Sequence, residues 1–380
     1  MTMTDWQVLL RGQLRDLGPY VPGSSAADAR ARYGVDDLAR LNWNEGLFGP
    51  LPGVLEDTAR RLDEAWTYPE EAYEELRDAV AGWLAVPRGQ VLPGHGIQAL
   101  VMTVIAAFVS PGDRVVVPRP TYGLYAPACQ AAGAIVRHVD CPELRLDLER
   151  IAAAAREADA KLVWICDPNN PTGARLEPGE WAAFLDALPG GCVAVADEAY
   201  VDYIRPEDRT PRLADVAAGR RVVVLRTFSK IFSLAGLRLG YAVVDEALTP
   251  YLHAVQEPFN VNIAALAAGC SALSRPDAID ARREETIACR ELLIERLRGG
   301  GLSPLPSDAN FVLVPLDGRD DLAVTERIAR RGILVRPGTE FGLPGHVRIT
   351  VAPAPLMERV AAELLDACDL SAPEPEPAAT

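Results

Sequence analysis

Short apolar runs alternate with helical segments through the middle of the chain, and this alternation constrains the fold more than any other feature. The runs that predict strands cover 114–118, 135–139, 162–166, 193–196, 221–225 and 241–244. Several are apolar throughout, which is typical of strands covered on both faces. Segments with helical composition and spacing lie between them, at 126–132, 148–158 and 180–188. The pattern therefore predicts an α/β fold with a mainly parallel central sheet.

The rest of the chain predicts a second, smaller domain of α+β type. A polar-faced helix over 284–298 is followed by short strands and a final helix, expected at 310–315, 333–336, 346–351 and 356–368. A length of 380 residues is consistent with two domains. We expect an N-terminal arm with part of the small domain, a large domain, the remaining small domain and a disordered Pro- and Glu-rich tail, covering 1–40, 41–275, 276–370 and 371–380.

Composition excludes several classes of partner. The formal net charge is −15, whereas nucleic acids and anionic membranes are bound by clustered cationic charge, so we expect neither partner. The longest apolar run, near 101–109, is far too short to cross a bilayer, and residues 1–14 do not read as a signal peptide. The seven cysteines are scattered, without a CxxC pair. They predict neither disulfides nor a metal site and favour a reducing cytoplasm.

Lysine is almost absent from the chain. Among 38 basic residues, Lys161 and Lys230 are the only lysines. Codon bias explains most of this preference, but arginine cannot form a Schiff base or lose its proton near neutral pH. A position whose chemistry needs a primary amine would therefore keep lysine. Lys161 opens a predicted strand and is expected to be an exposed structural residue, whereas Lys230 follows the end of one.

Polar residues collect where the predicted strands end, which is where open α/β sheets bind ligands. The segments that follow four of the strands read Pro-Arg-Pro-Thr-Tyr at 118–122, Asp-Pro-Asn-Asn-Pro-Thr-Gly at 167–173, Asp-Glu-Ala-Tyr at 197–200 and Arg-Thr-Phe-Ser-Lys at 226–230. Thr227, Ser229 and Arg238 flank the lysine with two hydroxyls and a guanidinium, which suit a phosphate. Lys230 thus lies among groups that could bind an anion and a heteroaromatic ring.

Each of these groups also has an ordinary structural explanation. Residues 169–173 make a good turn on composition alone. Asp197 could cap a helix, although a carboxylate that ends an apolar strand usually needs a cationic partner. Gly94, His95 and Gly96 precede an apolar helix, where they could present amide donors to a phosphate or form a simple loop. That all the strand-end groups coincide by chance is much less credible than a shared site.

With these residues assembled, the chain resembles the fold-type I pyridoxal-phosphate aminotransferases, and within them the histidinol-phosphate aminotransferase group. The segments that carry the resemblance run in the family's order at 18–23, 41–45, 68–69, 120–122, 168–173, 197–200, 227–230, 234–238, 310–311, 332–336 and 347–350. They cover nearly the whole chain short of the tail. The resemblance implies a large domain with a mainly parallel sheet, a smaller α+β domain, and pyridoxal 5′-phosphate as the cofactor.

The resemblance also implies the catalytic roles. Lys230 would form the Schiff base with the cofactor and later shuttle a proton. Asp197 would pair with the pyridine nitrogen and keep it protonated, so that the ring accepts electrons. Tyr200 and Asn170 would hydrogen-bond the phenolic oxygen of the cofactor, and Tyr122 would stack on the ring.

Phosphate and substrate contacts follow from the same resemblance. The cofactor phosphate would be held by Gly94, His95, Gly96, Thr227, Ser229 and Arg238. Arg348 matches the family's substrate-anion arginine, with Asn44, Arg336 and Tyr20 as further substrate-binding residues. Tyr68 matches the residue that reaches into the site of the neighbouring subunit, which implies a homodimer with shared active sites.

Transamination between an amino donor such as glutamate and an oxo acceptor is the leading expectation. The acceptor could be imidazole-acetol phosphate or an aromatic or other 2-oxo acid, because two segments depart from the family's pattern. Residues 94–98 lack its acidic pair, so His95 either meets the cofactor or only fills the loop, and 351–355 lack its glycine-bearing turn. The same cofactor residues would also serve a decarboxylase, cyclase, oxidase or racemase. A non-enzymatic α/β binding module would require Lys230 and Asp197 to be coincidental.

Overall fold

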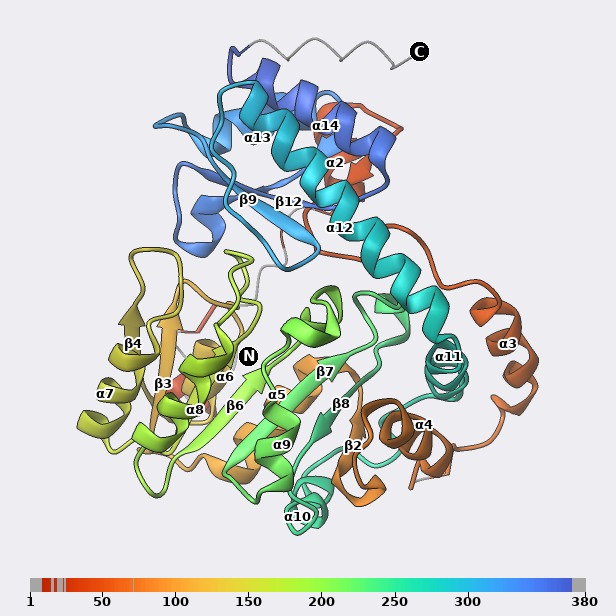
Figure 1. The fold of residues 1–380 in the computed structure, drawn as a ribbon, viewed down its shortest axis with the longest axis vertical. Helices are drawn as coiled ribbons and strands as arrows, with labels where there is room; N and C mark the ends of the chain where they lie inside the picture. The colour runs from red at the N-terminus through yellow and green to blue at the C-terminus, as the bar shows by residue number, and fades with distance from the viewer. Residues whose placement is uncertain (1–8, 15–16, 19–22, 24, 71, 371–380) are drawn as a thin grey trace, which may run out of the picture.

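A seven-stranded sheet forms the centre of the larger part of the molecule (Figure 1). The computed structural model describes residues 9–14, 17–18, 23, 25–70 and 72–370, so Tyr20 and the expected tail 371–380 lie outside the described residues. In the order β2-β8-β7-β6-β5-β3-β4, the strands of this sheet are Val91–Gly94, Gly240–Val243, Val222–Thr227, Val193–Asp197, Leu162–Cys166, Arg114–Arg119 and Ile135–Asp140. The neighbours from β7 to β4 are parallel, whereas β8 runs antiparallel to β7 and to β2.

Helices cover both faces of this sheet, as the continuous apolar runs predicted. Successive side chains of β5 go to opposite sides: Trp164 belongs to one buried cluster and Ile165 to the other. The cluster that contains Trp164 is formed with α5 (Gly96–Phe108), α6 (Tyr125–Ala131) and α10 (Thr249–Ala254). The cluster that contains Ile165 is formed with α3 (Val54–Arg61), α4 (Glu74–Leu84), α7 (Leu148–Ala158), α8 (Pro178–Ala187), α9 (Arg212–Ala217) and α11 (Ile263–Leu273).

A smaller layer of helices and short strands packs above the carboxyl ends of the large sheet (Figure 1). Its three-stranded antiparallel sheet has the order β11-β12-β9, with strands Arg336–Pro337, His346–Thr350 and Phe311–Pro315. Next to it, β1 (Ala39–Arg40) pairs in parallel with β10 (Ile333–Leu334). The helices of this layer are α2 (Ala26–Tyr33), α12 (Pro276–Gly299), α13 (Asp321–Ala329) and α14 (Ala354–Ala367). The expected combination of an α/β fold and a smaller α+β unit is confirmed.

Several element boundaries differ from the expected ones. The strand β2 was not predicted, because Pro93 and Gly94 are poor strand formers, but its place at the sheet edge accommodates them. The helix α12 begins at Pro276, eight residues before the predicted start at 284, since proline is well suited to the first helical turn. The expected strand 333–336 is divided into β10 and β11, which pair in different sheets. Within the described residues, no helix is long and apolar enough to cross a membrane.

Candidate active site

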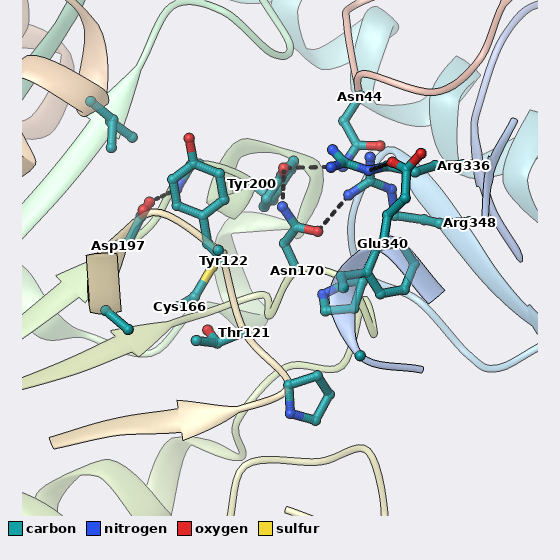
Figure 2. Close-up of a pocket in the computed structure, with 18 of the residues that line it drawn as sticks. Asn44, Thr121, Tyr122, Cys166, Asn170, Asp197, Tyr200, Arg336, Glu340 and Arg348 are labelled. Atoms are coloured by element: carbon teal, nitrogen blue, oxygen red, sulfur yellow. Dashed lines mark hydrogen bonds and ion pairs between the residues drawn. The ribbon is translucent and has the colours of Figure 1, made fainter. Parts of the chain in front are cut away.

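A cavity of about 1110 Å³ lies at the carboxyl ends of the large parallel strands, where the smaller layer covers them. Its walls come from both parts of the molecule. The expected site residues that line it are Asn44, Tyr122, Asn170, Asp197, Tyr200, Thr227, Ser229, Lys230, Arg238, Arg336 and Arg348. Figure 2 shows Asp197 at one end of this group, Arg336 and Arg348 at the other, and Tyr200 and Asn170 between them.

Lys230 projects into the cavity from the loop that follows β7. Its Nζ donates a hydrogen bond of 2.7 Å to the carbonyl oxygen of Asn44 and lies 5.3 Å from the centre of the Tyr200 ring. Burial, together with the positive charge of Arg348, lowers the pKa of this amine from 10.5 to about 7. A substantial fraction of the amine is therefore neutral near pH 7, as a nucleophile or a general base requires. Lys161, in contrast, is exposed and precedes β5 at its opposite end.

Asp197 ends β6, and only 2% of its surface is exposed. One carboxylate oxygen accepts a hydrogen bond of 2.6 Å from the Tyr125 hydroxyl, and the other accepts one of 3.0 Å from the Ala199 amide. Burial raises the pKa of Asp197 from 3.8 to about 6. Both donors are neutral, so this buried carboxylate is placed to receive a cationic partner from the cavity. The sequence did not single out Tyr125, because it lies in an apolar helix 72 positions away from Asp197.

Four side chains connect the large sheet to the smaller layer across the cavity. The hydroxyl of Tyr200 accepts hydrogen bonds from Asn44 Nδ2 at 3.1 Å and from Asn170 Nδ2 at 3.4 Å. The amide oxygen of Asn170 in turn accepts one of 2.7 Å from Arg348 Nη1. Burial raises the pKa of the Tyr200 phenol, although Arg348 partly opposes this effect. Tyr200 is therefore protonated at neutral pH, and its hydroxyl can still donate a hydrogen bond.

The N-terminus of α5 forms the opposite wall, beside Arg238. Gly96 has φ +76°, which favours glycine, and a Cβ atom there would lie only 2.8 Å from Arg238 Nη2 and would displace this guanidinium. Thr227 and Ser229 also line the cavity. The backbone amides at the start of a 13-residue helix, two hydroxyls and a guanidinium are groups that could bind a phosphate.

Four of the expected residues that the structure describes do not line the cavity: Gly94, His95, Gly96 and Tyr68. His95 is exposed at the N-cap of α5, and Gln98, one turn later, lines the cavity and donates a hydrogen bond of 3.0 Å to the Tyr122 hydroxyl. The sequence did not single out Gln98, because a polar residue in a helix is an ordinary surface feature. The side chain of Tyr68 is 81% exposed and stacks on Phe259, with 4.9 Å between the ring centres. Tyr20 falls outside the described residues.

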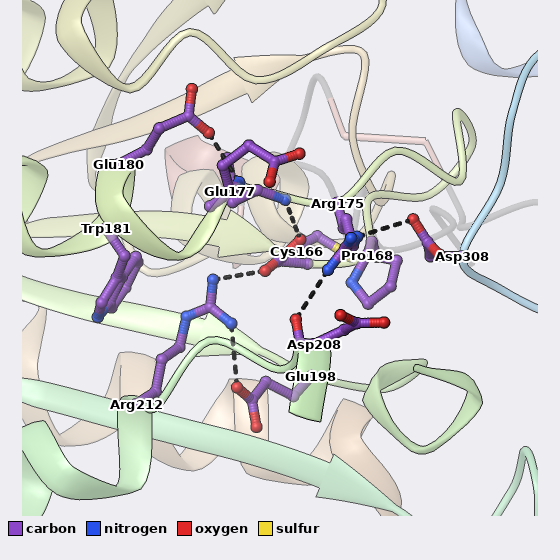
Figure 3. Close-up of polar contacts among 12 residues, drawn as sticks. Cys166, Pro168, Arg175, Glu177, Glu180, Trp181, Glu198, Asp208, Arg212 and Asp308 are labelled. Carbon is purple, nitrogen blue, oxygen red and sulfur yellow. Dashed lines mark hydrogen bonds and ion pairs between the residues drawn. The ribbon is translucent and has the colours of Figure 1, made fainter. Parts of the chain in front are cut away.

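A second charge cluster, the Arg212 network, consists of Arg212, Asp167, Glu198 and Arg226, and Figure 3 shows Arg212 beside Glu198. The guanidinium of Arg212 donates to Asp167 at 2.5 Å and to Glu198 at 3.0 Å, and Glu198 also accepts from Arg226 Nε at 2.8 Å. All four residues are buried, and two positive and two negative charges balance. Burial alone would raise the pKa of Glu198, but Arg226 and Arg212 hold it below its ordinary value. The network ties together the ends of β5, β6 and β7, which carry Asn170, Asp197 and Lys230.

Comparison with known proteins agrees with this geometry. The family model described as aminotransferase class I and II matches residues 36–364. The chain belongs to this family. The expected family membership and aminotransferase function are confirmed.

Individual relatives place this aminotransferase more closely. It is 37% identical to a histidinol-phosphate aminotransferase of Symbiobacterium thermophilum, over 90% of the chain and 94% of the relative. A histidinol-phosphate aminotransferase of Geobacillus thermodenitrificans is 36% identical, over 92% and 96% respectively. Among solved structures, a histidinol-phosphate aminotransferase from Sinorhizobium meliloti in complex with pyridoxal-5′-phosphate superimposes with a TM-score of 0.87 at 28% identity, covering 95% of this chain and 97% of that one.

Proposed function

We propose that this aminotransferase holds pyridoxal 5′-phosphate through Lys230 and exchanges an amino group between histidinol phosphate and a 2-oxo acid. One observation carries the proposal: the amine of Lys230, whose pKa is lowered to about 7, and the buried carboxylate of Asp197 line one cavity together with the N-terminus of α5. This set matches the amine, the anion and the phosphate site that the cofactor needs. The names of the relatives supply the choice of histidinol phosphate.

The residues of the cavity fit the cofactor group by group. Its phosphate would lie at the start of α5 with Arg238, Thr227 and Ser229, where Gly96 leaves space that a Cβ would fill. The protonated ring nitrogen would meet Asp197, whose two hydrogen-bond donors are neutral. Tyr200 and Asn170 would hold the phenolic oxygen. When bound, the cofactor supplies an electron sink that stabilises negative charge on the substrate carbon bearing the amino group.

The protein's own groups position the substrate and move the proton. Once displaced from the cofactor, the amine of Lys230, with its pKa of about 7, would take the proton from the substrate carbon that bears the amino group and deliver it to carbon C4′ of the cofactor. The Asn44 carbonyl, which accepts from Lys230 Nζ at 2.7 Å, restricts where this amine can point. Arg348 would bind the anionic group of the substrate, while its bond to Asn170 links substrate position to cofactor position.

The active unit of this proposal is a homodimer. Aromatic side chains that are normally covered are exposed along one segment: Trp66 is 87% and Tyr68 is 81% exposed, and Phe259 stacks on Tyr68. Such patches are typical of subunit interfaces. We place Tyr68 in the cavity of the neighbouring subunit, next to the substrate. A cytoplasmic location goes with the proposal, because the seven cysteines are all free thiols.

Half-reactions with single substrates test the function directly. The loss of the cofactor absorbance band would be followed after mixing the holoenzyme with histidinol phosphate, glutamate, and aromatic, basic or small amino acids. We expect the fastest response to histidinol phosphate, and no response from Lys230→Ala, with Lys161→Ala as the matched control that behaves like the wild type. Turnover of a free amino acid with no response to histidinol phosphate would contradict the substrate. Release of CO₂ or consumption of O₂ would contradict transamination.

A further inference from the structure

An acidic side chain shares the substrate end of the cavity with the two arginines. Glu340 lies on the short helix η7 (Gly338–Phe341), directly after β11, and it lines the cavity. Its Oε2 accepts a hydrogen bond of 3.1 Å from Arg336 Nε. Figure 2 shows its carboxylate among Arg336 and Arg348. A carboxylate is unexpected at a place that the proposed function reserves for a substrate anion.

The strand register explains why a counter-charge is needed there. Arg336 of β11 and Arg348 of β12 are directly opposite each other in an antiparallel pair. Directly opposed residues project from the same face of a sheet, and two like charges in this position repel each other. The repulsion is weakly screened, since only 12% of the Arg336 side chain is exposed and Arg348 is buried. Glu340 supplies the compensating negative charge from within the chain.

Glu340 thereby changes the charge that a substrate meets. The three side chains together carry a single positive charge, because one of two guanidinium charges is balanced by the carboxylate. Two of the hydrogen bonds that Arg348 donates go to neutral oxygens, those of Asn170 and of the Asn42 backbone. A singly charged anion matches this net charge. The second negative charge of a phosphate dianion, including that of histidinol phosphate, comes close to Glu340, so Glu340 limits the affinity for such a substrate without excluding it.

We propose that Glu340 is a specificity-determining residue: it is the internal counter-ion of the Arg336–Arg348 pair and lowers the affinity of the cavity for doubly charged anions relative to singly charged ones. This inference rests on the proposed function, in which these arginines hold the substrate anion. The effect should scale with ligand charge, because the Coulomb energy between Glu340 and a dianion is twice that with a monoanion at the same place.

Anion binding to the holoenzyme tests the inference without any turnover. Inorganic phosphate at pH 8 and acetate, at constant ionic strength, would be titrated against the wild type and Glu340→Gln, with the shift of the thermal unfolding midpoint and of the cofactor absorbance as readouts. We expect Glu340→Gln to bind acetate roughly threefold and phosphate about tenfold more tightly. Doubling the charge of the ligand doubles the repulsion energy that the substitution removes, so the factor by which the affinity rises is squared. Glu326→Gln is the matched control, since Glu326 makes the same i,i+4 pair with Arg330 on the surface.

The other outcomes are decisive as well. Equal gains for both anions, no gain, or no binding of either anion to the wild type would overturn the inference. If Glu340 only held Arg336 in place, Glu340→Gln would keep the hydrogen bond and behave like the wild type, while Glu340→Ala would weaken both anions. The two proposals can fail separately. If Glu340→Gln gains more affinity for phosphate than for acetate, but the enzyme reacts with no amino donor of the half-reaction panel, the role of Glu340 stands and the proposed function is refuted.

Discussion

Asp197 is a carboxylate that the fold holds almost completely away from water, at the end of a buried strand. Burial raises its pKa to about 6, so in the folded cofactor-free protein the ionised form of Asp197, which the proposed chemistry needs, is energetically unfavourable. Such a group is kept for function, since a neutral side chain would be easier to bury. The same applies to Lys230, whose pKa is lowered to about 7 by burial. Together the two residues destabilise the folded cofactor-free protein, and binding of the cofactor would offset this destabilisation.

We predict that Asp197→Asn stabilises the cofactor-free protein at pH 7 and abolishes transamination. A folded pKa above the unfolded value favours the protonated form, so the contribution of Asp197 to stability is complete below about pH 4 and lost as the pH rises through about 6. The gain at pH 7 should be roughly 2–3 kcal/mol, at about 1.4 kcal/mol per pKa unit. Urea unfolding at pH 4 and pH 7 measures it, and a gain that is the same at both pH values would contradict the assignment.

At the scale of elements, the Arg212 network holds the ends of three neighbouring strands in register. Asp167 follows β5, Glu198 follows β6 and Arg226 lies in β7, so the residues that carry the proposed chemistry all extend from segments that this network joins. The guanidinium of Arg212 also stacks over Trp181, with its central carbon 4.4 Å from the centre of the ring. Rigid support of this kind fixes the position of catalytic groups.

Arg212→Met should therefore destabilise the protein by about 3–5 kcal/mol, because it leaves two buried carboxylates without their shared cation. It should also weaken cofactor binding, since Asp167 and Glu198 adjoin the segments of Asn170 and Asp197. Arg205→Met is the matched control, because Arg205 pairs with Glu284 on the surface and should cost less than about 1 kcal/mol. Denaturant unfolding and cofactor titration by absorbance measure the two effects. Equal losses in both variants would show that the network contributes no more than a surface pair.

Elements could be predicted from the sequence wherever local pattern and burial agree. The parallel strands were recognisable because both faces are covered, which makes their apolar runs continuous. Lys230 and Asp197 could be predicted as candidates because they lie at strand ends, and Arg238 because it follows Lys230 in a segment rich in anion-binding groups. Tyr125 and Glu340 were not, since what matters about each is a contact or a strand register set by folding. The hydrophobic pattern of an element indicates which of its faces are buried, but it does not indicate which distant side chain each residue contacts.

At the scale of the whole molecule, the cavity lies between two layers, and the proposed dimer would complete it. We predict that Trp66→Asp converts a dimer into a monomer and removes most transaminase activity, because a charge in the exposed aromatic segment opposes burial at an interface. Sedimentation velocity measures the association. Leu322→Asp, an exposed apolar position on α13, is the matched control and should leave the dimer intact. A Trp66→Asp variant that stays dimeric would place the interface elsewhere.

The contrast between the two lysines has a practical consequence. Lys161 is exposed before β5, whereas Lys230 faces a covered cavity. An acylating reagent that modifies amines would therefore meet just two side-chain targets in the entire chain, one at the surface and one in the pocket. Peptide mapping of the reacted protein would give the extent of modification at Lys161 as an internal standard. The ratio between the two lysines then reports the fraction of molecules whose pocket amine is occupied, in any mixture and without a chromophore.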